Sequence, residues 1–101
     1  MEFKYLKKRK AAFLDRDGVI NYDYGYVHNW NNFEFCDGAI EGLKLLISLD
    51  FIIIIITNQS GIDRGLFTDK QYNILTDRLL ENLHKNNINI SAIYHCPHHP
   101  N

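Results

Sequence analysis

The sequence has few of the features that place a chain outside the soluble globular class. Only two cysteines occur in 101 residues, Cys36 and Cys96, which is too few for a disulfide scaffold. The longest apolar run, residues 51–56, is far shorter than the roughly 20 residues that a membrane span requires. Near the start, Asp15 interrupts the apolar stretch that follows the first basic residues, so no signal peptide is predicted. We therefore expect a cytoplasmic protein that does not enter a membrane.

An excess of charge of either sign is also missing. Lys and Arg together number 11 and Asp and Glu 12, which gives a formal net charge of −1. The basic cluster at residues 4–10 is short and terminal, and we interpret it as a solvated lead-in. Nucleic acid is therefore not an expected partner. The apolar content of 46% argues against disorder of the whole chain and fits a single domain over residues 1–101.

Short apolar runs alternate along the chain with stretches of helical periodicity. We expect strands over residues 11–14, 51–56 and 90–94, helices over 38–49 and 68–85, and a short extended piece at 33–35. Asp37 is predicted to cap the first helix, and Thr68 with Gln71 has the spacing of a capping box for the second. The five isoleucines of 52–56 are typical of an inner parallel strand covered by helices on both sides. This order predicts a right-handed, doubly wound α/β sheet.

Two polar clusters follow the first two expected strands, at the edge where such sheets bind ligands. In the first cluster, Asp15 and Asp17 are two positions apart, so their side chains are predicted to leave the strand on the same side. A carboxylate pair of this kind can bind a hard cation such as Mg²⁺, or divide into a nucleophile and a proton carrier. Gly18 would let the backbone turn close to a ligand. The alternative is an ordinary solvated turn.

The second cluster, Thr57 to Gly61, offers hydroxyl, amide and backbone donors in one place. Such a set is typical of an anion-binding loop. The alternative is a strand-to-helix connection that is merely rich in turn-forming residues. Because both clusters follow neighbouring strands, we favour a functional site.

The two clusters together resemble a known family. AAFLDRDGVIN followed by IIIIITNQSGIDRG resembles the first two motifs of the haloacid dehalogenase superfamily of aspartyl-phosphate phosphatases. DYGYVH, NFEFCDG, TNQSGIDRG and YHCPHHP resemble more narrowly its heptose bisphosphate and histidinol phosphate phosphatases, so the resemblance extends over residues 11–100. It implies a Rossmann-like core without a separate cap domain, truncated after the third strand.

The resemblance also implies a reaction, the hydrolysis of a small phosphorylated sugar through an aspartyl-phosphate. The expected substrate is a heptose 1,7-bisphosphate, which loses its C7 phosphate during the synthesis of nucleotide-activated heptose for lipopolysaccharide. Histidinol phosphate is the alternative substrate. A truncated remnant that binds phosphate without catalysis is the alternative function.

Roles for individual residues follow from the same resemblance. Asp15 resembles the nucleophile and Asp17 the general acid that later acts as base, with Mg²⁺ held by the Asp15 carboxylate and the Asp17 carbonyl. Thr57 and Asn58 resemble the phosphate cradle. Arg64 suits a second phosphate because a guanidinium grips two oxygens, although it can also be an exposed loop arginine. The segments that resemble substrate contacts are Asp23, Tyr24, Gly25, Tyr26, Gln59 and Ser60.

The end of the sequence matches only part of the family pattern. Cys96 and His98 resemble half of a structural Zn²⁺ site, and two ligands do not close a tetrahedral zinc site. We interpret His95 and His99 as surface histidines. The lysine and the acidic residue that complete the family site lie on later strands with no counterpart in this sequence. We therefore expect this chain to be weakly active or inactive alone, with an apolar sheet edge open to self-association or to complementation by a C-terminal fragment.

Overall fold

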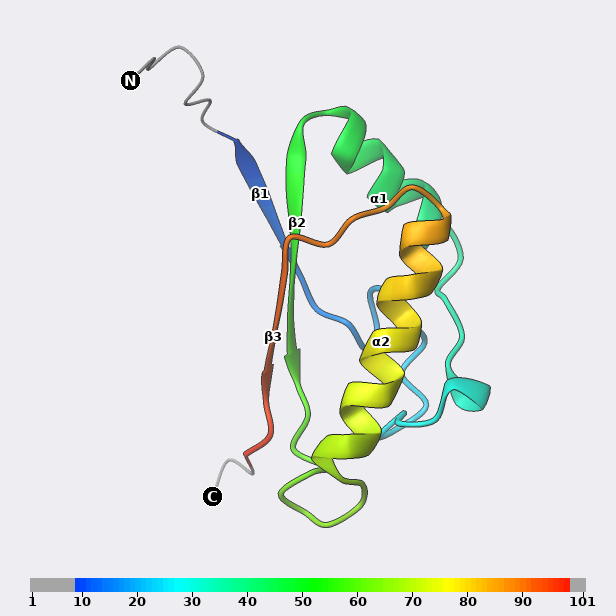
Figure 1. The fold of residues 1–101 in the computed structure, drawn as a ribbon, viewed down its shortest axis with the longest axis vertical. Coiled ribbons are helices and arrows are strands. Elements are labelled where there is room, and N and C mark those ends of the chain that lie inside the picture. Colours follow the sequence, from blue (N-terminus) through cyan, green and yellow to red (C-terminus); the bar gives the residue numbers. More distant parts are fainter. Residues whose placement is uncertain (1–8, 99–101) are drawn as a thin grey trace.

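The structure is a computed structural model that describes residues 9–98. Strands and helices alternate along the chain, as the apolar pattern predicts (Figure 1). In chain order the elements are β1 (Lys10–Leu14), a 3-10 turn (Trp30–Asn32), α1 (Ala39–Ser48), β2 (Phe51–Asn58), α2 (Asp69–Lys85) and β3 (Ala92–Cys96). The α/β class and the number and order of the main elements agree with the prediction.

The strands form one parallel sheet in the order β1-β2-β3. Leu14 at the end of β1 pairs with Ile55, and Cys96 at the end of β3 pairs with Asn58. β2 is therefore the inner strand, as its isoleucines predict. Parallel pairing also brings the carboxyl ends of β1 and β2 to the same edge of the sheet, where the predicted polar clusters begin.

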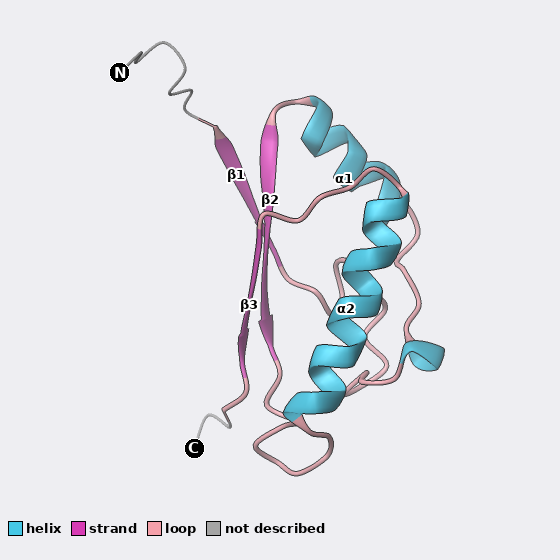
Figure 2. Ribbon diagram, viewed as in Figure 1, coloured by secondary structure: helices cyan, strands magenta, loops and turns pink. Residues whose placement is uncertain are grey.

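Both helices lie on the same face of this sheet (Figure 2). On β2, Ile53 and Ile55 are fully buried beneath them, whereas Ile56 is 46% exposed. The expectation of helices on both faces is therefore wrong for residues 9–98. The reason is topological: both crossovers step in the same direction along the sheet, and right-handed crossovers then place both helices on one side.

The core lies between the sheet and the two helices. Ile53 and Ile55 contribute from the sheet, Leu43 from α1, and Leu79 and Leu83 from α2. The two leucines of α2 are four residues apart, so they lie on one stripe of that helix and bury it against the sheet. This packing holds β2 rigidly and therefore fixes the position of the polar residues at its end.

The helix caps agree with the sequence in one case and differ in the other. Gln71 N donates to Thr68 Oγ1 at 3.1 Å and Thr68 N donates to Gln71 Oε1 at 2.9 Å, which confirms the capping box. α1 is not capped by Asp37. It begins after Gly38, which has φ 80°, and no side chain caps the helix. The chain enters α1 through the left-handed region, which glycine adopts without strain.

The largest differences from the predicted boundaries are in β2, in β3 and in the expected piece at 33–35, while the ends of the other elements differ by one residue at most. β2 extends two residues further than expected, to Asn58, and β3 starts and ends two residues later, at Ala92–Cys96. The expected extended piece at 33–35 is reduced to a single bridge between Asn21 and Phe35. Polar residues are therefore part of the strand at the ends of β2 and β3, because ladder pairing continues beyond the apolar run. No helix within residues 9–98 is long and apolar enough to cross a membrane.

Candidate active site

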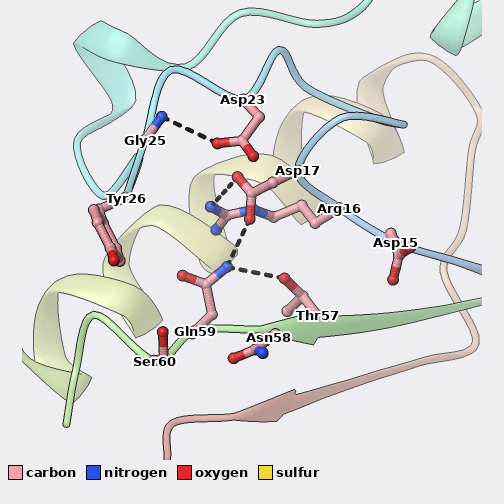
Figure 3. A pocket seen from close by; sticks show the side chains of 10 residues that line it. All are labelled: Asp15, Arg16, Asp17, Asp23, Gly25, Tyr26, Thr57, Asn58, Gln59 and Ser60. Carbon is pink, nitrogen blue, oxygen red and sulfur yellow. Dashed lines mark hydrogen bonds and ion pairs between the residues drawn. The ribbon is translucent and has the colours of Figure 1, made fainter. Parts of the chain in front are cut away.

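A pocket of about 380 Å³ opens at the carboxyl ends of β1 and β2 (Figure 3). The residues that line it come from the end of β1, the loop after it, and the end of β2. They are Asp15, Arg16, Asp17, Asp23, Gly25, Tyr26, Thr57, Asn58, Gln59 and Ser60. All of them except Arg16 are candidates from the sequence. The structure therefore brings the two polar clusters into one cavity.

Asp15 directly follows β1, and its side chain is exposed to the pocket. Among residues 9–98, no side chain or backbone group forms a hydrogen bond or ion pair with its carboxylate, which also stands apart in Figure 3. A free, accessible carboxylate can approach a phosphorus atom or bind a cation. This is the state that the nucleophile of an aspartyl-phosphate enzyme requires.

Asp17 lies in the same pocket, but its carboxylate is fully engaged. Oδ1 accepts hydrogen bonds from Arg16 Nη2 at 2.8 Å and from Asn21 Nδ2 at 3.0 Å. Oδ2 accepts a hydrogen bond from Gln59 Nε2 at 3.0 Å. Three donors from three positions fix both oxygens of this side chain. The two aspartates therefore share a pocket and differ sharply in their freedom to move.

A tight turn after β1 creates this arrangement. The backbone N–H groups of Ile20 and Asn21 donate to Arg16 O at 2.8 and 3.1 Å, and Gly18 N donates to Asn21 O at 2.7 Å. Gly18 has φ 90°, in the region that glycine adopts without strain. The turn folds Asn21 back onto Asp17 and so supplies one of its hydrogen-bond donors. Gly18 is thus required by the turn itself.

The end of β2 supplies the other side of the pocket. Thr57 is 3% exposed, and its Oγ1 accepts a hydrogen bond from Gln59 Nε2 at 2.9 Å. The hydroxyl hydrogen of Thr57 can therefore be donated to a bound anion. Gln59 N donates to Cys96 O at 2.7 Å, so the end of β3 holds this segment in place. Asn58 is exposed and lines the pocket beside Thr57.

The loop after the first turn forms one rim of the pocket. Asp23 Oδ1 accepts a hydrogen bond from Gly25 N at 3.0 Å, which closes a local turn. Gly25 has φ 86° and Tyr26 has φ 53°, so the loop contains a tyrosine in the left-handed region. Non-glycine residues in that region cost free energy and are concentrated at functional sites. Val27 O accepts a hydrogen bond from Arg16 Nη2 at 2.9 Å, which ties this loop to the turn after β1.

A second loop, after β2, packs against the first. Gly61 is buried where a Cβ atom would meet Tyr26 Cδ1 at 2.9 Å and would clash with the ring of Phe67. Phe67 also stacks on the ring of His28, with 5.0 Å between ring centroids. The absence of a side chain at Gly61 thus lets the two loops close on each other beside the pocket.

Two substrate-contact candidates lie outside this pocket. Tyr24 lines a neighbouring hollow of about 510 Å³ that shares Gly25 and Tyr26 with it. The hydroxyl of Tyr24 donates to Glu34 Oε1 at 2.7 Å, and this hydrogen bond raises the pKa of Tyr24 above its ordinary value. Arg64 is exposed on the loop after β2 and does not line either cavity.

Two residues near Asp17 were missed by the sequence analysis, Arg16 and Asn21. Both are buried, with 1% and 0% of their surface exposed. An arginine between two aspartates carries no local signal of burial, because charged side chains are usually exposed. Asn21 is the last residue of the motif DRDGVIN, and this position is the one feature of the sequence that could have indicated a role for it.

The pocket has oxygen donors that suit Mg²⁺. This cation binds proteins through one or two carboxylates and completes its shell with water and phosphate oxygens. The free carboxylate of Asp15 fits that role, whereas the carboxylate of Asp17 already accepts three hydrogen bonds. A complete protein cage is absent from the described part of the chain, where no three His, Cys, Asp or Glu side chains converge.

The predicted zinc half-site receives no support. Cys96 ends β3 and His98 follows it, and both are exposed. Within residues 9–98 they are not joined by a third ligand. His95, on β3, instead stacks on Tyr72 with 4.1 Å between ring centroids. His99 lies outside the described residues.

Comparison with known proteins connects this geometry to named enzymes. No family model matches the chain. It is 48% identical over 94 residues to the D-glycero-beta-D-manno-heptose-1,7-bisphosphate 7-phosphatase of Escherichia coli strain K12, covering 93% of this chain and 49% of the relative. It is 50% identical over 93 residues to the D-glycero-alpha-D-manno-heptose-1,7-bisphosphate 7-phosphatase of Photorhabdus laumondii, covering 92% and 51%.

A solved structure agrees with these relatives. The D,D-heptose 1,7-bisphosphate phosphatase from B. bronchiseptica, complexed with magnesium and phosphate, matches with a TM-score of 0.84 and 33% identity. The match covers 91% of this chain and 52% of that structure. The chain thus spans about half the length of the relatives it matches. Over that half it is homologous to them in sequence and in fold.

Proposed function

We propose that this chain, a homologue of the heptose 1,7-bisphosphate 7-phosphatases, carries the phosphoryl-transfer site of such an enzyme and removes the C7 phosphate of a D-glycero-D-manno-heptose 1,7-bisphosphate. One observation carries the proposal: a free carboxylate, Asp15, shares a pocket with a second, immobilised carboxylate, Asp17. An accessible carboxylate can attack phosphorus, and a second carboxylate held in the same pocket can exchange a proton with the leaving oxygen. The names of the relatives supply the substrate class.

In the first half of the proposed reaction, an oxygen of Asp15 attacks the phosphorus atom and the bond between phosphorus and the sugar oxygen breaks. Asp17 enters this half protonated, gives its proton to that leaving oxygen, and becomes the carboxylate that accepts the three hydrogen bonds described above. In the second half, Asp17 takes a proton from a water molecule, which attacks the aspartyl-phosphate and releases inorganic phosphate and free Asp15. Mg²⁺, when bound by Asp15 and the Asp17 carbonyl, neutralises charge on the phosphoryl oxygens.

The remaining residues bind and orient the substrate in this proposal. Thr57 and Asn58 donate hydrogen bonds to the phosphoryl oxygens from the end of β2. Asp23, Gly25, Tyr26 and Ser60 face the sugar from the two loops that close beside the pocket. Tyr24, in the neighbouring hollow, and Arg64, on the exposed loop, are proposed contacts for the more distant end of the substrate.

The assay measures phosphate release from the heptose bisphosphate, and histidinol phosphate serves as the competing substrate. It is run on the chain alone and on the chain mixed with a polypeptide made of the part of the Escherichia coli relative that the match leaves out. We expect the mixture to hydrolyse the bisphosphate faster than histidinol phosphate, and the chain alone to be weakly active. Faster turnover of histidinol phosphate would contradict the proposed substrate.

Two finer proposals rest on the sequence alone. We propose zinc binding at Cys96 and His98 only together with ligands from outside this chain, because two ligands do not close such a site. We also propose a cytoplasmic location, because the sequence predicts no membrane span. We still predict that two copies of the chain associate through β1, which lies at an edge of the sheet in the described residues.

A further inference from the structure

We propose that Arg16, Asn21 and Gln59 are positioning residues that hold the carboxylate of Asp17 in the orientation that proton transfer requires. The inference rests on the proposed function, because it assigns a purpose to the way one member of the aspartate pair is held. Gln59 is one of the substrate contacts that the resemblance implies, and in this inference all three residues act on the reaction through Asp17.

The contacts form a three-donor clamp, defined here as Arg16, Asn21 and Gln59. Arg16 Nη2 and Asn21 Nδ2 bind Oδ1 of Asp17, at 2.8 and 3.0 Å, and Gln59 Nε2 binds Oδ2 at 3.0 Å. The exposed fractions of the three donor residues are 1%, 0% and 4%, whereas the Asp17 side chain retains 21%. The clamp is therefore buried, and the Asp17 side chain that it holds is partly exposed in the pocket.

Each donor of the clamp is fixed by a second hydrogen bond. Arg16 Nη2 also donates to Val27 O at 2.9 Å, and Asn21 Nδ2 also donates to Tyr22 O at 3.1 Å. The same amide nitrogen of Gln59 donates to Thr57 Oγ1 at 2.9 Å. Donors held in this way cannot turn away from Asp17 without breaking a second contact. The clamp therefore restricts the rotation of the Asp17 side chain.

This restriction matters because the two aspartates have different tasks. The nucleophile must move toward phosphorus as its bond forms, and Asp15 is free to do so. The proton carrier must lie within hydrogen-bond reach of the leaving oxygen at the moment that bond breaks, and a misplacement of 1 Å costs about 10²-fold in rate. In this structure the clamp sets the orientation of Asp17, the proton carrier.

The contact between Arg16 and Val27 gives the clamp a second consequence. Val27 directly follows Tyr26 on the loop that forms the rim of the pocket. A guanidinium that binds both the loop and Asp17 makes their positions depend on each other. A substrate that seats the loop correctly therefore also favours the correct orientation of Asp17.

The test compares two substrates that differ in their need for a proton. A sugar alkoxide is a poor leaving group and needs protonation, whereas the nitrophenolate of p-nitrophenyl phosphate leaves without it. In the chain mixed with the unmatched part of the relative, Gln59→Met and Asn21→Leu remove one donor each and keep side-chain size. Because Asp17 also acts on water in the second half with either substrate, the comparison uses the rate of the first half, measured by rapid quenching as phosphoenzyme formation. We expect that rate to fall about 10²-fold for the heptose bisphosphate and less than threefold for p-nitrophenyl phosphate, with little change in the substrate concentration that gives half the maximal rate.

The control is Thr76→Val, which alters a buried polar side chain of α2 that is not one of the hydrogen-bond donors to Asp17. It should leave the ratio of the two rates of phosphoenzyme formation unchanged. Equal losses on both substrates in the clamp variants would mean that the residues have only a structural role, and would overturn the proposal.

A second measurement requires no activity and separates this inference from the proposed function. In the isolated chain, the side-chain amide signals of Asn21 and Gln59 are followed by ¹⁵N NMR. We expect both amides to be protected from solvent exchange, to lose that protection in Asp17→Ala, and to keep it in Asp15→Ala. Amides that exchange freely in the wild-type chain would overturn the clamp. An inactive mixture with protected amides would instead contradict the proposed function and leave the clamp standing.

Discussion

Gln59 Nε2 lies 3.0 Å from Oδ2 of Asp17, although 42 positions separate the two residues in the sequence. The bond crosses from the end of β2 to the turn after β1, so it exists only because parallel pairing brings both strand ends to one edge. Together with the bonds from Arg16 and Asn21, it restricts the rotation of the Asp17 side chain, whereas the Asp15 carboxylate has no such partner among residues 9–98. The following predictions test this site and the packing that supports it.

Replacing Asp17 should separate the two halves of the reaction. In Asp17→Asn the nucleophile is intact, but the leaving oxygen and the attacking water lose their proton carrier, so turnover should fall about 10²–10⁴-fold. Rapid quenching should reveal phosphoenzyme that accumulates on Asp15, because attack is separable from the later hydrolysis. A variant with turnover near that of the wild type would remove Asp17 from the mechanism.

Gly61→Ala should disturb the two loops beside the pocket. The added methyl group would meet Tyr26 Cδ1 at 2.9 Å and the ring of Phe67, so we expect a loss of about 1–3 kcal/mol in the free energy of unfolding. Gly42→Ala is the matched control, since its added Cβ on α1 would meet no atom within 4 Å other than its chain neighbours and the backbone of its own helix. It should stabilise the chain by about 0.5–1 kcal/mol. Urea unfolding of both variants measures the difference, and equal effects would contradict this packing.

Thr68→Ala should destabilise the start of α2. It removes the hydroxyl that accepts from Gln71 N at 3.1 Å and thereby opens the capping box. The expected cost is about 1 kcal/mol in the free energy of unfolding. Hydrogen exchange should accelerate at the first turn of α2 and remain unchanged near Leu83. Unchanged exchange at that first turn would show that the cap contributes little.

The buried tyrosine of α2 should make stability depend on alkaline pH. Burial raises the pKa of Tyr72 above its ordinary value of 10.0, and the Thr76 hydroxyl and the charge of Arg16 offset only part of this rise. The folded state therefore holds the proton more tightly than the unfolded state. Its contribution to stability is complete below the unfolded pKa and is lost as the pH rises through the folded pKa.

Tyr72→Phe isolates that contribution. Between about pH 8 and about pH 11 the wild-type chain should lose more unfolding free energy than the variant, because the variant has no proton to release at this position. The ring that stacks on His95 is retained in the variant, so the packing is matched. Identical losses in both proteins would show that Tyr72 does not titrate differently in the folded state.

Local patterns in the sequence predicted much of this architecture. The isoleucine run predicted the inner strand, the spacing of Thr68 and Gln71 predicted the cap of α2, and the polar residues after β1 and β2 predicted the pocket. Each of these signals lies within a few neighbouring residues. Such signals reflect backbone preferences and burial, which a single segment already expresses.

The remaining features depend on contacts between distant segments. The burial of Arg16 requires an acceptor on Val27 and another on Asp17, and the role of Gln59 requires that β2 end beside the turn after β1. The placement of both helices on one face depends on the direction of two crossovers, which apolar periodicity does not encode. The position of Tyr24 in a neighbouring hollow depends on the loop geometry at Gly25.

The most direct test of the proposed function is phosphate release from the heptose 1,7-bisphosphate by the wild type and by Asp15→Asn, each with Mg²⁺ and the unmatched part of the relative. We predict that the wild type releases the C7 phosphate and retains the C1 phosphate, as followed by ³¹P NMR. Asp15→Asn should release none, because an amide oxygen is a poor nucleophile. Release by Asp15→Asn at the wild-type rate would show that Asp15 is not the nucleophile and would contradict the proposed mechanism.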